Sequence, residues 1–182
     1  INALPNHQLA LSIDLGGMLV LAGNTKGLRA FEATVPKLAP FPLRLANHGA
    51  FHTDLMTPIS DQGLAQFPAD PFGQPKIPMI DGRGHIWWPH ASDPRALRHY
   101  TLGTQVTEPY DFTHAIRIAA REFAPDLFIV AGPGTTLGGA VAQSMVLSGW
   151  RGLTDKHAFE AMQARDTILV SMGRADQRGF VT

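Results

Sequence analysis

Strand-like and helix-like segments alternate along this chain, and the alternation constrains its fold more than any other feature of the sequence. Residues 127–131 are a β-rich run that ends in Gly132-Pro133-Gly134, and residues 137–147 then have helical character. Helical periodicity also precedes this run, at 112–123. Strands that alternate with helices in this way favour βαβ units, whose strands pair in a parallel sheet. The sequence therefore predicts an α/β fold. Beyond Trp150 the sequence has a plausible helix at 157–164 and a β-like run at 167–171.

The beginning of the chain has a different order, with two strands before the first helix. The predicted order is strand, strand, helix, strand, at 9–13, 18–22, 25–35 and a run that follows Pro40-Phe41-Pro42 and ends near Ala46. Gly16-Gly17 between the first two strands indicates a hairpin. Asn24 or Thr25 is suited to cap the helix.

The middle of the chain is predicted to be mainly helical. Helices are expected at 53–67, 94–102 and 112–123, and a short buried strand at 77–80. Ser92-Asp93-Pro94 combines an N-cap with a proline in the first helical turn, which is typical of a helix start.

Charge and composition exclude several classes of function. Lys plus Arg equals Asp plus Glu at 15 each, so the bulk charge suggests no nucleic-acid or anionic-membrane partner. With no cysteine, the chain has no disulfide, no cysteine nucleophile and no thiolate zinc site, which fits a reducing compartment. The longest apolar stretches are far shorter than the ~20 residues that span a bilayer. The first residue is Ile rather than Met, which we interpret as a sign of truncation or proteolysis.

The run 43–56 places a histidine where a strand turns into a helix. A short β-type stretch ends in Gly49-Ala50, His52 follows at the exit of the turn, and a helix-like segment begins at once. An imidazole, which titrates near neutral pH, can take a proton from a serine hydroxyl and later return one to a leaving thiol. His52 is therefore a candidate general base. The alternative is a core histidine with satisfied hydrogen bonds at a strand-helix junction.

Four segments in a fixed order point to a family. They are 19–23, 43–56, 103–112 and 130–134. Within roughly residues 8–147, they resemble segments of the malonyl-CoA:acyl carrier protein transacylases and of the acyltransferase domains of fatty-acid and polyketide synthases, including the Ala-Phe-His pattern around the general base and the Gln-x-x-x-Pro-Val-x-Trp/Phe pattern. Asp14-Leu15-Gly16-Gly17 departs from the Asn-x-Pro-Gly turn that is usual in the family.

The resemblance implies roles for three residues. His52 matches the general base, and Gln105 matches the glutamine whose main chain orients that base, in place of the carboxylate of a serine hydrolase triad. Phe51 matches the bulky residue that accompanies malonyl selectivity. The nucleophile of the family, a serine in a Gly-x-Ser-x-Gly elbow, is found nowhere in this sequence. The resemblance places it in an N-terminal segment, together with the oxyanion amides and an arginine for the malonyl carboxylate.

The resemblance also implies a fold and a set of partners. It predicts that 1–46 form part of a ferredoxin-like small subdomain, that 47–149 form the C-terminal part of an α/β-hydrolase-like core, and that 150–182 form a tail of unknown role. The expected function is transfer of a malonyl or related acyl group from CoA to an acyl carrier protein, in fatty acid or polyketide biosynthesis in the cytoplasm. The substrates are CoA and phosphopantetheine thioesters, and no cofactor, metal, nucleic acid or membrane is expected. The chain alone should be inactive without the serine-bearing N-terminal segment.

Two other functions stay open at this point. A serine-histidine acyl or CoA hydrolase would use the same arrangement, with water in place of the second thiol. A non-catalytic docking or scaffold module could keep the fold without the serine half. Hydrolysis without transfer would favour the first alternative, and an intact Gly-x-Ser-x-Gly in the parent reading frame would argue against the second.

Two other motifs favour structural interpretations. His48 and His52 have the spacing of a helical zinc pair, but Gly49 lies between them and no His-Glu-x-x-His pattern is present, which disfavours a metal site. Gly132-Pro133-Gly134 precedes a helix and could face a phosphate. It lacks the full Gly-x-Gly-x-x-Gly fingerprint, so a tight turn is the better prediction.

Aromatic and basic side chains elsewhere are also expected to be structural. Trp87 and Trp88 could form an aromatic binding surface, but a loop that folds both indoles onto the core is the better prediction. Arg117 and Arg121 lie four residues apart and are expected on a solvated helix face.

Overall fold

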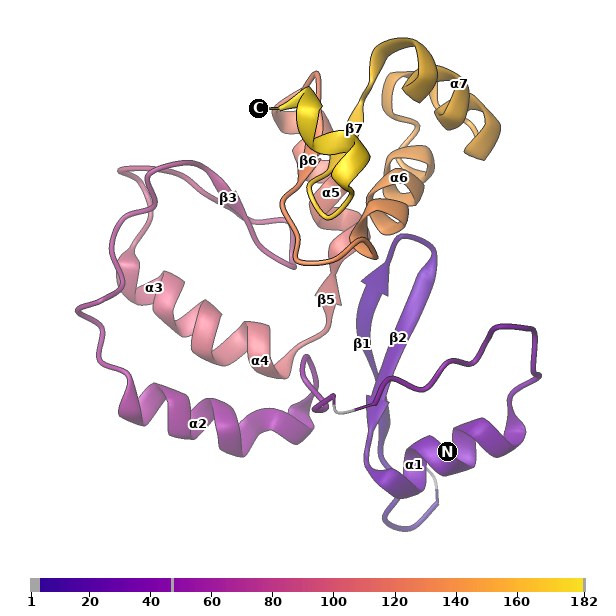
Figure 1. Ribbon diagram of the computed structural model, residues 1–182. Helices are drawn as coiled ribbons and strands as arrows, with labels where there is room; N and C mark the ends of the chain where they lie inside the picture. Colours follow the sequence, from indigo (N-terminus) through magenta and orange to yellow (C-terminus); the bar gives the residue numbers. More distant parts are fainter. Residues whose placement is uncertain (1–3, 47, 182) are drawn as a thin grey trace. The chain divides into compact units, whose positions relative to one another are not determined.

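The computed structural model describes residues 4–46 and 48–181, which form two compact units of mixed α/β structure (Figure 1). Unit 1 takes its described residues from Ile1–Ile13, Leu19–Met79 and Trp87–Tyr110, and unit 2 from Asp14–Met18, Ile80–Ile86 and Asp111–Thr182. The strands are β1 (Leu9–Leu15), β2 (Met18–Gly23), β3 (Met79–Ile80), β4 (Ile86–Trp87), β5 (Tyr110–Asp111), β6 (Phe128–Val130) and β7 (Leu169–Ser171). The α-helices are α1 (Thr25–Thr34), α2 (Thr57–Gln66), α3 (Pro94–His99), α4 (Gln105–Thr107), α5 (Phe112–Glu122), α6 (Leu137–Leu147) and α7 (Lys156–Asp166). Short 3₁₀ segments are η1 (Asp54–Met56), η3 (Trp150–Gly152) and η4 (Ala175–Phe180), and η2 (Tyr100–Thr104) is a π-helical turn.

The hairpin and the first helix form where the sequence predicts them. β1 and β2 are joined by Gly16 and Gly17, whose φ angles of +60° and +85° give the left-handed pair that a two-residue hairpin turn requires. The strands of this sheet follow the order β2-β1-β5. α1 is capped by Asn24, whose Oδ1 accepts a hydrogen bond from the Gly27 N–H at 2.8 Å.

The strand predicted to end near Ala46 is wrong. Residues 43–46 form no strand, and the β-type pairing just before them is an isolated antiparallel bridge between Leu38 and Phe41. These two residues donate their backbone N–H groups to each other's carbonyl oxygens, at 2.9 and 2.6 Å, and so close a tight loop. Pro40 and Pro42 have no N–H to donate to a neighbouring strand, so the chain turns back on itself at 38–42 and leads into 43–46 without a strand partner.

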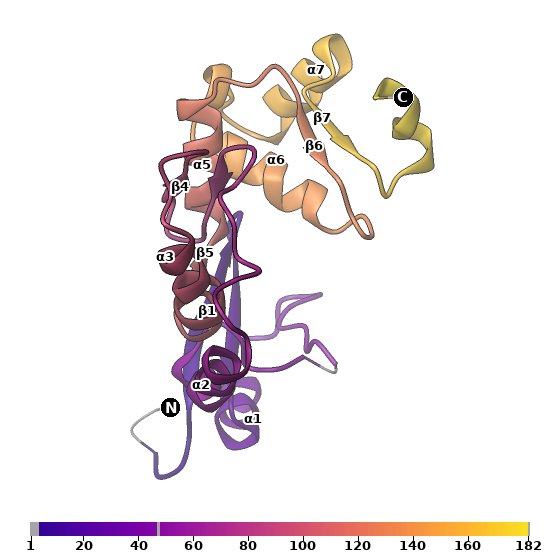
Figure 2. The ribbon, with the colours of Figure 1, turned by 90° about the vertical axis from the view of Figure 1, so that its left-hand side faces the viewer.

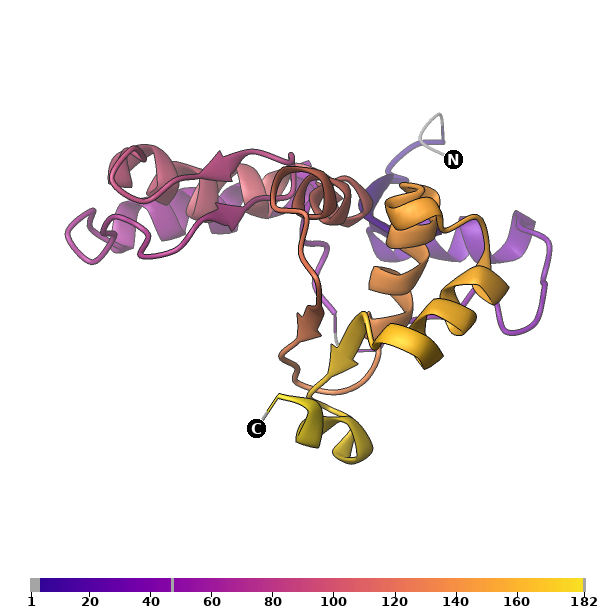
Figure 3. The same ribbon diagram turned by 90° about the horizontal axis from the view of Figure 1, so that it is seen from above.

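The central helices of unit 1 follow the prediction and extend beyond it. The predicted helix at 53–67 forms as η1 and α2, and α3 begins at the predicted cap, where Asp93 accepts a hydrogen bond from the Arg95 N–H. The helical path continues through η2 and α4 to Thr107. Figures 1 and 3 show α2 lying alongside this second helical path, and the Ser60 hydroxyl joins them by donating to the Leu102 carbonyl at 2.8 Å. The α4 end of this path carries Gln105.

The short strand predicted at 77–80 is only partly correct. The strand covers Met79–Ile80 and pairs with β4. It is not buried as predicted, because Ile77 is 70% exposed and Met79 is 39% exposed. An apolar run of this length predicts an extended segment but not what covers it.

Unit 2 contains a parallel pair of strands, and its second strand lies within 150–182, the segment whose role the sequence leaves open. β6 and β7 pair in parallel, with Phe128 opposite Leu169 and Val130 opposite Ser171, and they run side by side in Figure 2. The connection between them passes through α6, η3 and α7. The buried core of this unit is made by Ala120, Val141, Met145, Trp150, Leu153, Ile168 and Leu169. The predicted α/β class is therefore confirmed, while its ferredoxin-like and hydrolase-like descriptions and the division at 46 and 149 stay predictions.

None of the helices in 4–46 and 48–181 combines the length and the apolar character that crossing a membrane requires.

Candidate active site

Hydrogen bonds anchor the turn that contains His52 to two elements of unit 1. From β1, the buried Ser12 hydroxyl donates to the Phe51 carbonyl at 2.9 Å. From α4, the Val106 carbonyl accepts the backbone N–H of His52 at 2.9 Å. The Thr53 hydroxyl closes the turn by donating to the Ala50 carbonyl at 2.6 Å. The backbone on both sides of His52 is therefore fixed independently of the imidazole.

The backbone of His52 is itself unusual. Its φ angle is +63°, in the left-handed region that residues with a Cβ rarely occupy. This conformation costs about 1–2 kcal/mol for an L-residue other than glycine. His90 has the same φ angle of +63°, so this conformation marks a local backbone cost at the turn and does not by itself assign a role to the side chain.

The imidazole of His52 is held by the main chain of Gln105. Nδ1 lies 2.5 Å from the Gln105 carbonyl oxygen, across 53 positions of sequence. A carbonyl oxygen can only accept, so Nδ1 carries the proton and Nε2 has the lone pair of the neutral ring. The structure thus brings together the two residues that the sequence paired, through the main chain of Gln105. Their catalytic roles stay predictions.

Phe51 lies directly before His52 with its ring largely at the surface. The side chain is 47% exposed, and its ring packs against Gly49. A Cβ added at Gly49 would lie 3.1 Å from Cε2 of the Phe51 ring, closer than an ordinary van der Waals contact. Gly49 therefore allows the ring to lie close to the loop backbone. The influence of Phe51 on acyl selectivity stays a prediction.

Sequence reasoning missed two residues of this site. Ser12 is only 4% exposed and lies among Leu, Ala and Ile residues in β1. A serine in such a run is the sequence signal that could have identified it. The Tyr110 ring lies beside the His52 ring, with centroids 5.4 Å apart and planes tilted by 55°. Tyr110 belongs to the 103–112 segment that contains Gln105, so the segment was identified but this residue was not.

The other histidine of the run points to a different partner. Nδ1 of His48 lies 2.8 Å from the Ala46 carbonyl oxygen, whereas the His52 ring contacts Gln105. Within the described ranges, no group of three or more His, Cys, Asp or Glu residues is arranged to hold a metal ion.

The Gly132-Pro133-Gly134 turn lies against the backbone of Gly173 in unit 2. Gly132 and Gly134 have φ angles of +100° and +77°. A Cβ added at Gly173 would lie 1.9 Å from the Gly134 carbonyl oxygen, so two backbone segments meet here with no room for a side chain. This contact supports the structural interpretation of the turn.

The two neighbouring tryptophans differ in burial. Trp87 is 7% exposed and packs against Tyr100, with ring centroids 5.9 Å apart. Trp88 is 46% exposed, so the prediction that both indoles fold onto the core is wrong for the second. Arg117 and Arg121 are exposed on α5, as predicted.

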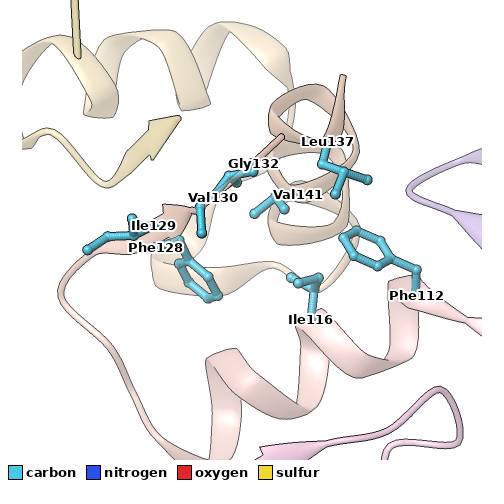
Figure 4. A pocket seen from close by; sticks show the side chains of 9 residues that line it. Phe112, Ile116, Phe128, Ile129, Val130, Gly132, Leu137 and Val141 are labelled. Carbon is cyan, nitrogen blue, oxygen red and sulfur yellow. The ribbon is translucent and has the colours of Figure 1, made fainter. Parts of the chain in front are cut away.

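Unit 2 also contains an apolar hollow of about 230 Å³ (Figure 4). Its lining includes Phe112 and Ile116 of α5, Phe128 and Val130 of β6, and Leu137 and Val141 of α6. These side chains carry neither charge nor hydrogen-bonding groups. The hollow can receive hydrocarbon surface but offers no proton-transferring group.

No family model matches the chain, and no curated protein matches its sequence. Solved structures do. The chain is similar to the malonyl-CoA:ACP transacylase of Synechocystis sp. PCC 6803, with a TM-score of 0.66 and 18% identity over 96% of this chain and 51% of that one. It is also similar to the acyl carrier protein S-malonyltransferase of Vibrio cholerae O1 biovar eltor str. N16961, with a TM-score of 0.63 and 18% identity over 100% of this chain and 52% of that one. The chain is similar as well to the acyl-carrier-protein S-malonyltransferase of Burkholderia pseudomallei 1710b. Here the TM-score is 0.58 and the identity 20%, over 87% of this chain and 51% of that one.

These likenesses concern the fold. The chain has the fold of malonyl-CoA:ACP transacylases over about half of their length, which confirms at the level of fold the resemblance seen in the sequence.

Proposed function

We propose that this chain supplies the general base of an acyltransferase that moves a malonyl or related acyl group from CoA to an acyl carrier protein. The observation that carries the proposal is the His52–Gln105 contact, in which a carbonyl oxygen holds the proton on Nδ1 and leaves Nε2 as the acceptor. The fold shared with malonyl-CoA:ACP transacylases supports this choice of reaction.

In the proposed reaction, Nε2 of His52 takes the proton of a serine hydroxyl as the serine oxygen attacks the thioester carbon. The carbon-sulfur bond then breaks, and the imidazolium returns the proton to the leaving CoA thiolate. The second half runs in reverse, with the phosphopantetheine thiol of the carrier protein as the nucleophile. The Gln105 carbonyl stabilises the imidazolium in both halves, as the carboxylate does in a serine hydrolase triad.

The nucleophile has to come from a serine-bearing segment beyond these 182 residues, either joined to the chain or separate from it. No serine of the sequence has the flanking glycines of a nucleophile elbow. Ser144 lies within α6, where its hydroxyl donates to the Ala140 carbonyl, and Ser148 directly follows that helix. Ser12 and Ser60 donate to the carbonyls of Phe51 and Leu102.

The test measures transfer of labelled malonyl groups from CoA to an acyl carrier protein. The chain alone should give no transfer, and a serine-bearing segment encoded with it should restore transfer when joined or mixed. Replacing the serine of that segment by alanine is the control and should abolish the restored activity. Full transfer by the chain alone would contradict the proposal, and release of free malonate without transfer would identify a hydrolase.

A further inference from the structure

One short segment makes three contacts with His52. The backbone N–H of His52 donates to the Val106 carbonyl at 2.9 Å. The ring N–H donates to the Gln105 carbonyl at 2.5 Å. The ring of Tyr110 lies against the imidazole, with centroids 5.4 Å apart. The last two contacts act on the ring itself, and all three come from residues 105–110.

The two ring contacts restrain different motions. The hydrogen bond to Gln105 fixes the position of Nδ1. A single hydrogen bond restrains the tilt of the imidazole plane much less. Tyr110 restrains the plane of the ring, because tilted aromatic rings attract one another at centroid separations of 4.5–7 Å. The direction in which Nε2 points is therefore set by both contacts together.

We propose that Tyr110 is a positioning residue for His52, which holds the plane of the imidazole so that Nδ1 stays bonded to the Gln105 carbonyl and Nε2 keeps the direction that the proposed acyl transfer needs. The inference rests on the proposed function for its catalytic consequence only, because the contact itself is a property of the chain. The contact is made by the aromatic ring. In the sequence pattern that identified Gln105, the position of Tyr110 is a valine, so this contact is not part of that pattern.

The expected consequence is a loss of rate with little change in binding. Proton transfer requires reacting atoms about 3 Å apart, and a misplacement of about 1 Å can cost about 100-fold. Without Tyr110 the imidazole is misaligned for proton transfer during only part of the time, so the loss should be smaller than 100-fold. We therefore expect Tyr110→Leu to lower the kcat of malonyl transfer about tenfold, with KM within about twofold.

The direct test is the ¹⁵N NMR spectrum of the His52 ring in this chain, assigned by comparison with His52→Ala. The wild-type ring should be mainly the Nδ1–H tautomer, Tyr110→Phe should preserve it, and Tyr110→Leu should shift it toward the mixture of a mobile histidine. The control is Tyr100→Phe, because Tyr100 is the other tyrosine of the chain and packs against Trp87 instead of His52. A folded Tyr110→Leu chain with unchanged tautomer and unchanged kcat would overturn the inference.

A second measurement needs no variant. Nuclear Overhauser effects between the two rings, and upfield ring-current shifts of the His52 ring protons, are expected in the wild-type chain. Their absence would overturn the inference even if Tyr110→Leu fails to fold. If the tautomer changes in Tyr110→Leu but no complex of the chain forms an acyl-serine, the proposed function fails and the positioning role remains.

Discussion

At the scale of single residues, His52 has a backbone conformation that costs free energy, while its side chain is held by the Gln105 carbonyl. The φ angle of +63° disfavours any residue with a Cβ, and glycine adopts it without that penalty. We expect His52→Gly to be more stable than His52→Ala by about 1 kcal/mol, although both remove the imidazole. Urea unfolding of the two variants measures the difference. Equal stabilities would show that the backbone of this turn is not strained.

Phe51 gives a second prediction at this scale, on acyl selectivity. If the ring occupies space that an α-methyl group needs, Phe51→Ser should raise the ratio of methylmalonyl to malonyl transfer by about fivefold, which corresponds to ~1 kcal/mol. The matched control is Phe41→Ser, because Phe41 is 50% exposed and Phe51 is 47% exposed. The comparison is of kcat/KM values for the two CoA esters in the completed enzyme. An unchanged ratio in Phe51→Ser would show that Phe51 is not the selector.

At the scale of elements, the cap of α7 connects stability to pH. The Ala158 N–H donates to Oδ1 of Asp155 at 2.8 Å, and this hydrogen bond lowers the pKa of the Asp155 carboxyl below its ordinary value of 3.8. A lowered pKa means that the stabilisation is complete above the unfolded pKa and is lost as the pH falls through the folded value.

We therefore expect Asp155→Ala to lower the urea midpoint at pH 7 and to have a smaller effect at pH 3. Asp155→Asn keeps an acceptor oxygen at the N-cap, so it should retain most of the midpoint at pH 7 and remove this part of the acid sensitivity. Circular dichroism during urea titration at both pH values checks the prediction. Equal losses at pH 7 and pH 3 in Asp155→Ala would show that the charged carboxylate adds nothing to the cap.

Elements with local signals were predicted well. Asn24, Asp93 and the glycine pair of the hairpin act within a few residues, so the helix starts and the turn could be read from the chain. The strand expected before Ala46 does not form, because a strand needs a neighbouring strand to pair with and the chain instead closes a loop at Leu38 and Phe41 just before it. The prediction that 77–80 is buried was wrong, because burial depends on which other segments cover a strand.

At the scale of the whole molecule, the site depends on contacts between segments far apart in sequence. His52 and Gln105 were paired only because the order of segments resembled a known family, and no local pattern predicts a bond across 53 positions. Ser12 and Tyr110 contact the same turn and could not be found from the sequence, since these contacts depend on how β1 and residues 105–110 fold around it. The fold class followed from alternation, which is visible in sequence.

The most direct test of the central claim is the single-turnover rate of acyl-serine formation in the completed enzyme. His52→Ala should reduce this rate by at least ~100-fold, the usual scale for the loss of a general base. The control is His48→Ala, because His48 is an exposed histidine of the same run whose ring contacts the Ala46 carbonyl. The account predicts near-normal acylation in His48→Ala and almost none in His52→Ala. Near-normal acylation in His52→Ala would contradict it.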